Sequence, residues 1–91
     1  MVEFKIGSNS MYLSVKEVKT LNEHKLLLTF ENGEVRLFDM SPYLQKGIFR
    51  ELKDLSLFKS VRVSFDTVEW ENEADIDSET LYENSVLYNI I

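Results

Sequence analysis

Few residues of this chain have the type and spacing that catalysis would require. His24 is the sole histidine, and it lies between charged residues in a segment typical of an exposed turn. Serine and aspartate are plentiful, but no G-x-S-x-G motif places a serine on a nucleophile elbow. The glycine-rich loops that hold nucleotide phosphates are also missing. We therefore expect no catalytic residue and no cofactor, and we interpret the protein as a non-enzyme.

The segment from Asp75 to Glu79 resembles the beginning of a calcium-binding loop. An EF-hand loop needs glycine at its sixth position and glutamate at its twelfth. Thr80 and Val86 stand at those positions when the loop is counted from Asp75. The chain has no cysteine, which excludes disulfides and cysteine-based zinc sites. The sequence therefore predicts no metal site.

Acidic residues recur at every second position between residues 69 and 77. This acidic series consists of Glu69, Glu71, Glu73, Asp75 and Asp77. In an extended chain the five would share one face, where like charges repel unless water or cations surround them. Residues 1–62 carry 10 Lys/Arg and 8 Asp/Glu, whereas residues 63–91 carry 8 Asp/Glu and neither Lys nor Arg. The acidic end is either a solvated surface or a docking surface for a basic partner, and it disfavours direct contact with nucleic acid.

Length and composition indicate one small globular domain. The 91 residues are too few for two cores without disulfides or metals. Hydrophobic residues make up 44% of the chain, which is typical of a folded protein. We predict a single domain over residues 1–91. The sequence shows neither an apolar run of about 18 residues nor a signal-peptide pattern, so we expect a cytoplasmic protein without membrane contact.

Alternating apolar residues predict a three-stranded meander near the beginning of the chain. Residues 11–20 are expected to form one strand, and residues 25–39 a hairpin. Asn32-Gly33 accepts the positive φ angles of a two-residue type I′ turn.

The expected two-residue loop also determines the register of this hairpin. It places Phe30 opposite Val35, so that apolar residues face each other on one side of the sheet. Leu27 and Phe38 then lie on the other side, which we expect to be partly covered.

Short helices are expected after this meander. Ser41 is the predicted N-cap, Pro42 suits a first helical turn, and residues 42–60 are predicted to form one or two short helices that pack on the sheet.

A second hairpin follows the helices. With a turn at residues 66–67, Phe65 would pair with Val68 and Val63 with Trp70, and all four side chains would point into the core. The second turn residue, Thr67, is β-branched and disfavours positive φ, so a slightly longer loop is an alternative.

The last part of the chain is acidic and then apolar. Residues 71–77 are expected to be a connector, and Asp77 is the predicted N-cap of a helix over residues 78–85. Residues 86–91 either pack back on the domain or add an edge strand, or they meet another subunit or partner.

Several of these segments, taken in order, resemble one known family. The segments are Phe30–Asp39, Pro42–Leu44, Gly47–Phe49, Val68–Trp70 and Asp75–Asp77. Together they are similar to a bacterial family called domain of unknown function 2442, and the resemblance covers about residues 13–85. Ser78 stands where the family often has proline, and both residues suit the first turn of a helix.

The resemblance implies a fold but no reaction. The family is similar to α+β domains and has neither an established enzyme activity nor assigned catalytic residues. Some relatives look like the second member of toxin–antitoxin-type gene pairs, which implies an accessory protein that restrains a partner. We predict an α+β fold with a small antiparallel sheet, built from an N-terminal three-stranded meander and a second hairpin, with short helices between and after.

The function expected from these observations is a non-catalytic, antitoxin-like protein-binding module with a basic protein partner. Its possible partner-binding residues are Glu69, Glu71, Glu73, Asp75, Asp77, Leu87, Tyr88 and Ile90. Other interpretations stay open: a homo-oligomer, a regulatory subunit that reaches nucleic acid through a partner, and a small-ligand binder or unrecognised enzyme, which would need a concave pocket.

Overall fold

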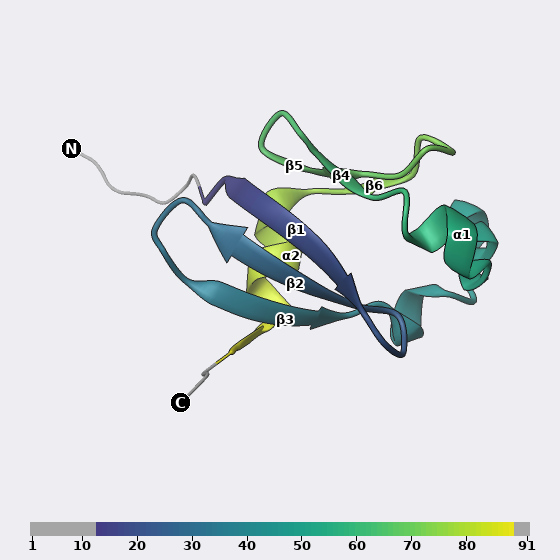
Figure 1. The fold of residues 1–91 in the computed structure, drawn as a ribbon, viewed down its shortest axis with the longest axis horizontal. Coiled ribbons are helices and arrows are strands. Elements are labelled where there is room, and N and C mark those ends of the chain that lie inside the picture. Colours follow the sequence, from purple (N-terminus) through teal and green to yellow (C-terminus); the bar gives the residue numbers. More distant parts are fainter. Residues whose placement is uncertain (1–12, 89–91) are drawn as a thin grey trace.

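The computed structural model of the chain describes residues 13–88 and shows an α+β fold with two antiparallel sheets (Figure 1). The four-stranded sheet has the order β1-β2-β3-β7, and the three-stranded sheet has the order β4-β5-β6. The strands are β1 (Val15–Leu21), β2 (Lys25–Phe30), β3 (Val35–Asp39), β4 (Arg62–Ser64), β5 (Thr67–Glu69), β6 (Asp75–Ile76) and β7 (Val86–Leu87). The predicted fold class is confirmed, although the second hairpin belongs to a sheet of its own.

The helical segments are short, and most of them lie between β3 and β4 in the sequence. They are η2 (Ser41–Tyr43), η3 (Gly47–Lys53), α1 (Leu55–Phe58) and α2 (Ser78–Glu83). The prediction that Ser41 caps a helix is wrong, because Ser41 is itself the first residue of η2. Its amide donates to the carboxylate of Asp39 at 2.9 Å, so the acceptor comes from the end of β3. Asp77 does cap α2, as predicted.

The hairpin loop contains three residues, 31–33, between the hydrogen-bonded Phe30 and Glu34, instead of the predicted two. The Gly33 amide donates to the Phe30 carbonyl at 2.9 Å, and the Phe30 amide donates to the Glu34 carbonyl at 2.9 Å. Gly33 has a φ of +89°, as in a type I turn followed by a glycine bulge. The predicted pairing of Phe30 with Val35 is therefore wrong, because Thr29 lies opposite Val35.

The observed register also corrects the predicted faces of this hairpin. Phe38 lies opposite Leu26, and both side chains are fully buried in the core. Leu27 lies opposite Leu37 on the other face, where both are only partly buried. A shift of one residue moves every side chain of one strand to the opposite face.

The second hairpin turns one residue earlier than predicted. Ser64 pairs with Thr67, so the turn residues are Phe65 and Asp66, and Val63 lies opposite Val68. The predicted Phe65–Val68 and Val63–Trp70 pairs and the core position of Phe65 are therefore wrong. Phe65 adopts a φ of +56° and is 100% exposed. A β-branched residue strongly disfavours positive φ, which explains why Thr67 lies in β5 and not in the turn.

The predicted acidic connector contains a strand that the sequence did not reveal. Asp75 pairs with Glu69 and Ile76 pairs with Val68, which together form β6 on the edge of the second sheet. Ile76 is 6% exposed and anchors this strand in the core. A strand of two residues is too short to show a periodic pattern.

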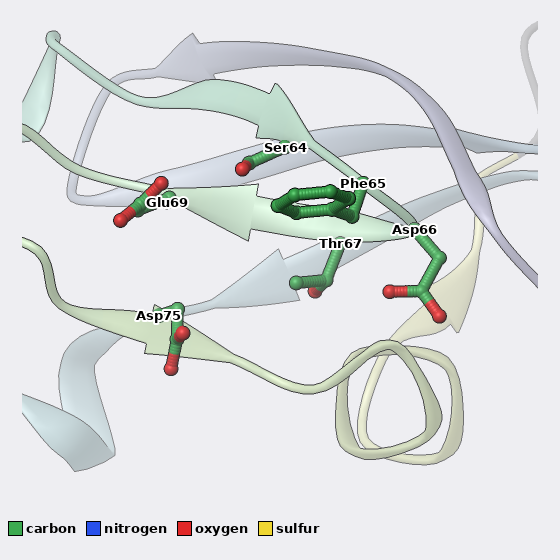
Figure 2. Close-up of a pocket in the computed structure, with 6 residues that line it drawn as sticks. All are labelled: Ser64, Phe65, Asp66, Thr67, Glu69 and Asp75. Carbon is green, nitrogen blue, oxygen red and sulfur yellow. The ribbon is translucent and has the colours of Figure 1, made fainter.

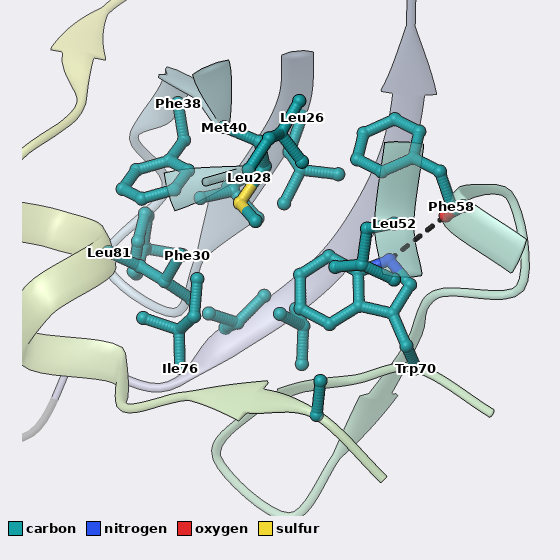
Figure 3. Packing of buried hydrophobic residues seen from close by; sticks show 14 residues of the cluster. Leu26, Leu28, Phe30, Phe38, Met40, Leu52, Phe58, Trp70, Ile76 and Leu81 are labelled. Carbon is teal, nitrogen blue, oxygen red and sulfur yellow. Dashed lines mark hydrogen bonds between the residues drawn. The ribbon is translucent and has the colours of Figure 1, made fainter. Parts of the chain in front are cut away.

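One cluster of buried side chains lies between the inner face of the first sheet, the second sheet and the helices (Figure 3). Its largest fully buried members are Trp70, Phe30, Phe38, Phe58, Leu26, Leu28, Met40, Leu52, Leu81 and Val68. The indole nitrogen of Trp70 donates to the carbonyl of Phe58 at 3.0 Å, so the one polar group of this side chain is satisfied.

A backbone hydrogen bond also connects the two sheets. The Val15 amide at the beginning of β1 donates to the Asp66 carbonyl in the turn between β4 and β5 at 3.0 Å. This bond places the Phe65–Asp66 turn beside the first strand.

Candidate functional site

The second sheet has one apolar and one polar face. Val68 and Ile76 are neighbours across β5 and β6, and both are buried. The next row across the three strands is polar and consists of Arg62, Glu69 and Asp75. Because side chains alternate along a strand, this row faces away from the core.

The polar face carries a pocket of about 280 Å³, which we call the Phe65 pocket. It is lined by Ser64, Phe65, Asp66, Thr67, Glu69 and Asp75. Figure 2 shows the Phe65 ring lying over β5, with carboxylates of its neighbours on different sides of it. The Thr67 hydroxyl donates to the Ile76 carbonyl and ties β5 to β6 below the ring.

Negative charge dominates the Phe65 pocket. Glu69 and Asp75 are directly opposite each other on neighbouring strands, an arrangement that like-charge repulsion disfavours. Arg62 offsets part of this charge, because its guanidinium lies 3.3 Å from the Glu69 carboxylate. Asp66 adds a third carboxylate to the lining. One cation therefore faces three carboxylates.

Phe65 contributes little to the stability of the fold. A fully buried phenylalanine typically stabilises a protein by about 1.5–3 kcal/mol relative to an exposed one. This ring is 100% exposed and gains none of that energy. Its left-handed backbone conformation costs a further 1–2 kcal/mol or so. A residue with these properties is a candidate for contact with another molecule.

The other members of the acidic series have different environments. Glu71 and Glu73 are exposed in the loop between β5 and β6. The Asp77 carboxylate accepts hydrogen bonds from the Thr80 hydroxyl at 2.7 Å and the Thr80 amide at 3.1 Å. These bonds, above all the one from the hydroxyl, lower the pKa of Asp77 and make it a structural cap. The structure thus brings only two residues of the predicted series, Glu69 and Asp75, into the pocket.

The apolar end of the chain belongs to the first sheet. Leu87 is 54% exposed in β7, and the Tyr88 amide donates to the Val35 carbonyl at 2.9 Å. Ile90 lies outside the described residues. The interpretation as an edge strand is confirmed for Val86 and Leu87. The apolar end and the Phe65 pocket are therefore on different sheets and form two separate surfaces.

Arg36 joins β3 to the C-terminal end of α2. Its guanidinium lies 4.2 Å from the centre of the Tyr82 ring and donates to the Ser85 hydroxyl at 2.8 Å and to the Ser85 carbonyl at 3.0 Å. A hydrogen bond from Tyr82, followed by one from Arg36, lowers the pKa of Glu34. These contacts are structural, and they occupy the guanidinium of Arg36 within the chain.

The structure gives His24 a packing role. Its Nε2 lies 3.0 Å from the Leu52 carbonyl oxygen, and its ring centre lies 4.8 Å from that of Phe58. The prediction that His24 is an exposed turn residue is therefore wrong in part: it lies in the turn but is partly buried.

Among residues 13–88, no three His, Asp or Glu side chains are grouped as metal ligands would be.

Sequence reasoning missed Phe65 and its pocket because alternation placed this residue in the core. The available signal was Thr67, whose branched side chain disfavours a position in a turn with positive φ. A turn placed one residue earlier would have exposed Phe65.

These features define a small α+β domain with an acidic pocket around an exposed aromatic ring. Its sequence matches the family described as "Protein of unknown function (DUF2442)" over residues 15–86. The chain therefore belongs to this family, as its motifs indicated. Neither a curated protein nor a solved structure matches the chain. Within the part of the chain that the structure describes, no helix is long and apolar enough to cross a membrane.

Proposed function

We propose that this protein is a non-catalytic protein-binding module and that the Phe65 pocket receives a lysine or arginine side chain of a basic partner. The observation that carries the proposal is the fully exposed Phe65 ring among the pocket's carboxylates. A cation within about 6 Å of a phenylalanine ring is attracted to its face. Carboxylates beside the ring would form charge-assisted hydrogen bonds with the same cation.

The charge of the whole chain supports this choice of partner. The net charge is −6, and residues 63–91 contain neither lysine nor arginine. Such a field accelerates the approach of a basic protein and repels nucleic acid. In the form suggested by the family resemblance, the protein is a cytoplasmic, antitoxin-like accessory protein whose basic partner is encoded beside it.

The test is a binding titration with the product of the neighbouring gene at several salt concentrations. Phe65→Gly removes the ring and also relieves the left-handed backbone, so this variant should fold at least as well as the wild type. We expect its affinity to fall about tenfold or more, because a few anchor residues, often aromatic, carry most of the energy of a protein interface. Asp75→Asn should also weaken binding and reduce its salt dependence.

Glu71→Gln is the matched control, because it removes the same charge from an exposed loop residue that does not line the pocket. We expect a smaller effect from it than from Asp75→Asn. If no complex forms, or if Phe65→Gly binds as tightly as the wild type, this proposal is wrong.

A further inference from the structure

We propose that the outer face of the first sheet docks a second copy of this chain and forms a two-fold symmetric dimer. The outer face is the side of β1, β2, β3 and β7 that points away from the core. One row across it consists of Lys19, Leu27, Leu37 and Val86, which are successive cross-strand partners. The centre of the face is thus apolar. The proposal concerns a different surface from the Phe65 pocket and does not depend on it.

No helix of the described residues covers this face. In Figure 1, α2 lies behind β1, β2 and β3, and α1 lies beyond one end of the sheet. Val86 is 61% exposed, Leu21 is 39% exposed and Tyr88 is 38% exposed. A group of apolar side chains on an exposed sheet face is typical of an interaction surface.

The register of the hairpin makes the outer face complementary to itself. Lys25 lies opposite Asp39, and Leu27 lies opposite Leu37. A two-fold axis parallel to the strands, midway between β2 and β3, places β2 of one copy opposite β3 of the other. Lys25 would then face Asp39 of the second copy and Leu27 would face Leu37 of the second copy. Each contact occurs twice.

The charge of the face selects a copy of this chain over a basic partner. Lys19 and Lys25 balance Glu17 and Asp39 on the same face, although the chain as a whole has a net charge of −6. A uniformly basic protein would meet both lysines, whereas a second copy places Asp39 opposite Lys25. Lys25 also contacts Glu23 of its own chain at 3.1 Å, so this ion pair competes with the one across the interface.

The size of the face predicts a weak dimer. The four strands contain seven, six, five and two residues, which at roughly 3.3 Å per residue and about 4.8 Å between strands have a footprint of about 320 Å². Stable complexes usually bury about 800 Å² on each partner. Two sheets can pack face to face in this way with their strands approximately aligned. We therefore expect association that depends on concentration.

Sedimentation equilibrium of the full chain over roughly 10 µM to 1 mM, a range suited to small interfaces, tests the proposal. We expect the wild type to pass from monomer to dimer. Val86→Lys places a lysine opposite Lys19 of the second copy and should weaken association at least tenfold. Val86 is 61% exposed, so this variant should remain folded. Leu55→Lys is the matched control, because Leu55 is 53% exposed in α1 and should not affect dimerisation.

A charge exchange gives a second test of the interface. Lys25→Asp and Asp39→Lys should each weaken the dimer, and the double variant should restore it. Lys25 and Asp39 are also cross-strand neighbours within one chain, so thermal unfolding of each variant is measured at low concentration to separate a loss of the fold from a loss of the dimer. A chain that stays monomeric over the whole range, or an association that Val86→Lys and Leu55→Lys affect equally, would overturn the proposal.

Discussion

Two loops of this protein, residues 30–34 and 70–74, share one pattern of hydrogen bonds but differ at the residue with positive φ. In the first, the Phe30 amide donates to the Glu34 carbonyl at 2.9 Å; in the second, the Trp70 amide donates to the Ala74 carbonyl at 2.9 Å. The left-handed residue is Gly33, with a φ of +89°, in one loop and Glu73, with a φ of +72°, in the other.

The comparison shows that glycine is not what determines this turn. Each loop begins at a fully buried aromatic residue, Phe30 or Trp70. In each, an asparagine side chain accepts a hydrogen bond from the amide two residues later, Asn32 at 3.0 Å and Asn72 at 3.1 Å. A left-handed non-glycine residue costs about 1–2 kcal/mol, which a buried anchor and these hydrogen bonds can outweigh.

Removing the aromatic residue that anchors a loop should have the largest effect on the free energy of unfolding. We expect Trp70→Ala to reduce the free energy of unfolding by about 3–5 kcal/mol. The loss should exceed that of Phe30→Ala, because Trp70→Ala also leaves the buried Phe58 carbonyl without its donor. Urea denaturation of both variants measures the difference, and a loss below about 1 kcal/mol for Trp70→Ala would show that the anchor is not essential.

Gly33→Ala should destabilise the protein by about 1–2 kcal/mol. A Cβ atom at Gly33 would meet no heavy atom within 4 Å, so backbone conformation is the only source of this loss. Thermal unfolding measures it. A variant as stable as the wild type would mean that the first loop tolerates a side chain as readily as the second does.

Asn72→Ala should destabilise the protein by about 1 kcal/mol, and more than Asn32→Ala does. Asn72 also donates to the Glu51 carboxylate at 2.8 Å and thereby ties the loop to η3. Glu51→Ala removes this contact and leaves the turn bond of Asn72 in place, so its loss separates the two contributions. Equal losses for the two single asparagine variants would show that the contact with Glu51 contributes nothing.

Glu73→Gly should have the smallest effect and the opposite sign. We expect stabilisation of about 0.5–1 kcal/mol, since relief of the left-handed strain outweighs the greater flexibility of glycine in the unfolded chain. Glu73→Gln keeps the strain and removes only the charge, so it serves as the control. Destabilisation by Glu73→Gly, measured by urea denaturation, would show that the left-handed conformation of Glu73 costs no stability.

Sequence reasoning identified both hairpins but not their registers. Asn32-Gly33 suits a two-residue turn and also a three-residue turn with a bulge at Gly33. Burial of Phe38 opposite Leu26 decides between them, and this is a tertiary effect that local pattern does not contain. The cap at Asp77 was predictable because its hydrogen bonds are local.

The candidate site was predictable only in part. Charge counting located Glu69 and Asp75, but the strand that pairs them is two residues long. Alternation of Val63 and Phe65 indicated a common buried face, whereas the turn exposes Phe65. Three-dimensional pairing of β5 with β6 creates the pocket, and spacing in the sequence does not contain this information.

The hydrogen bond from Val15 to Asp66 makes one amide a reporter on the contact between the two sheets. Val15 is 2% exposed, and its acceptor belongs to the other sheet. Exchange of this proton with deuterium therefore requires the beginning of β1 and the turn between β4 and β5 to separate. Its exchange rate in native buffer would measure how often the turn that carries the aromatic ring detaches from the rest of the protein.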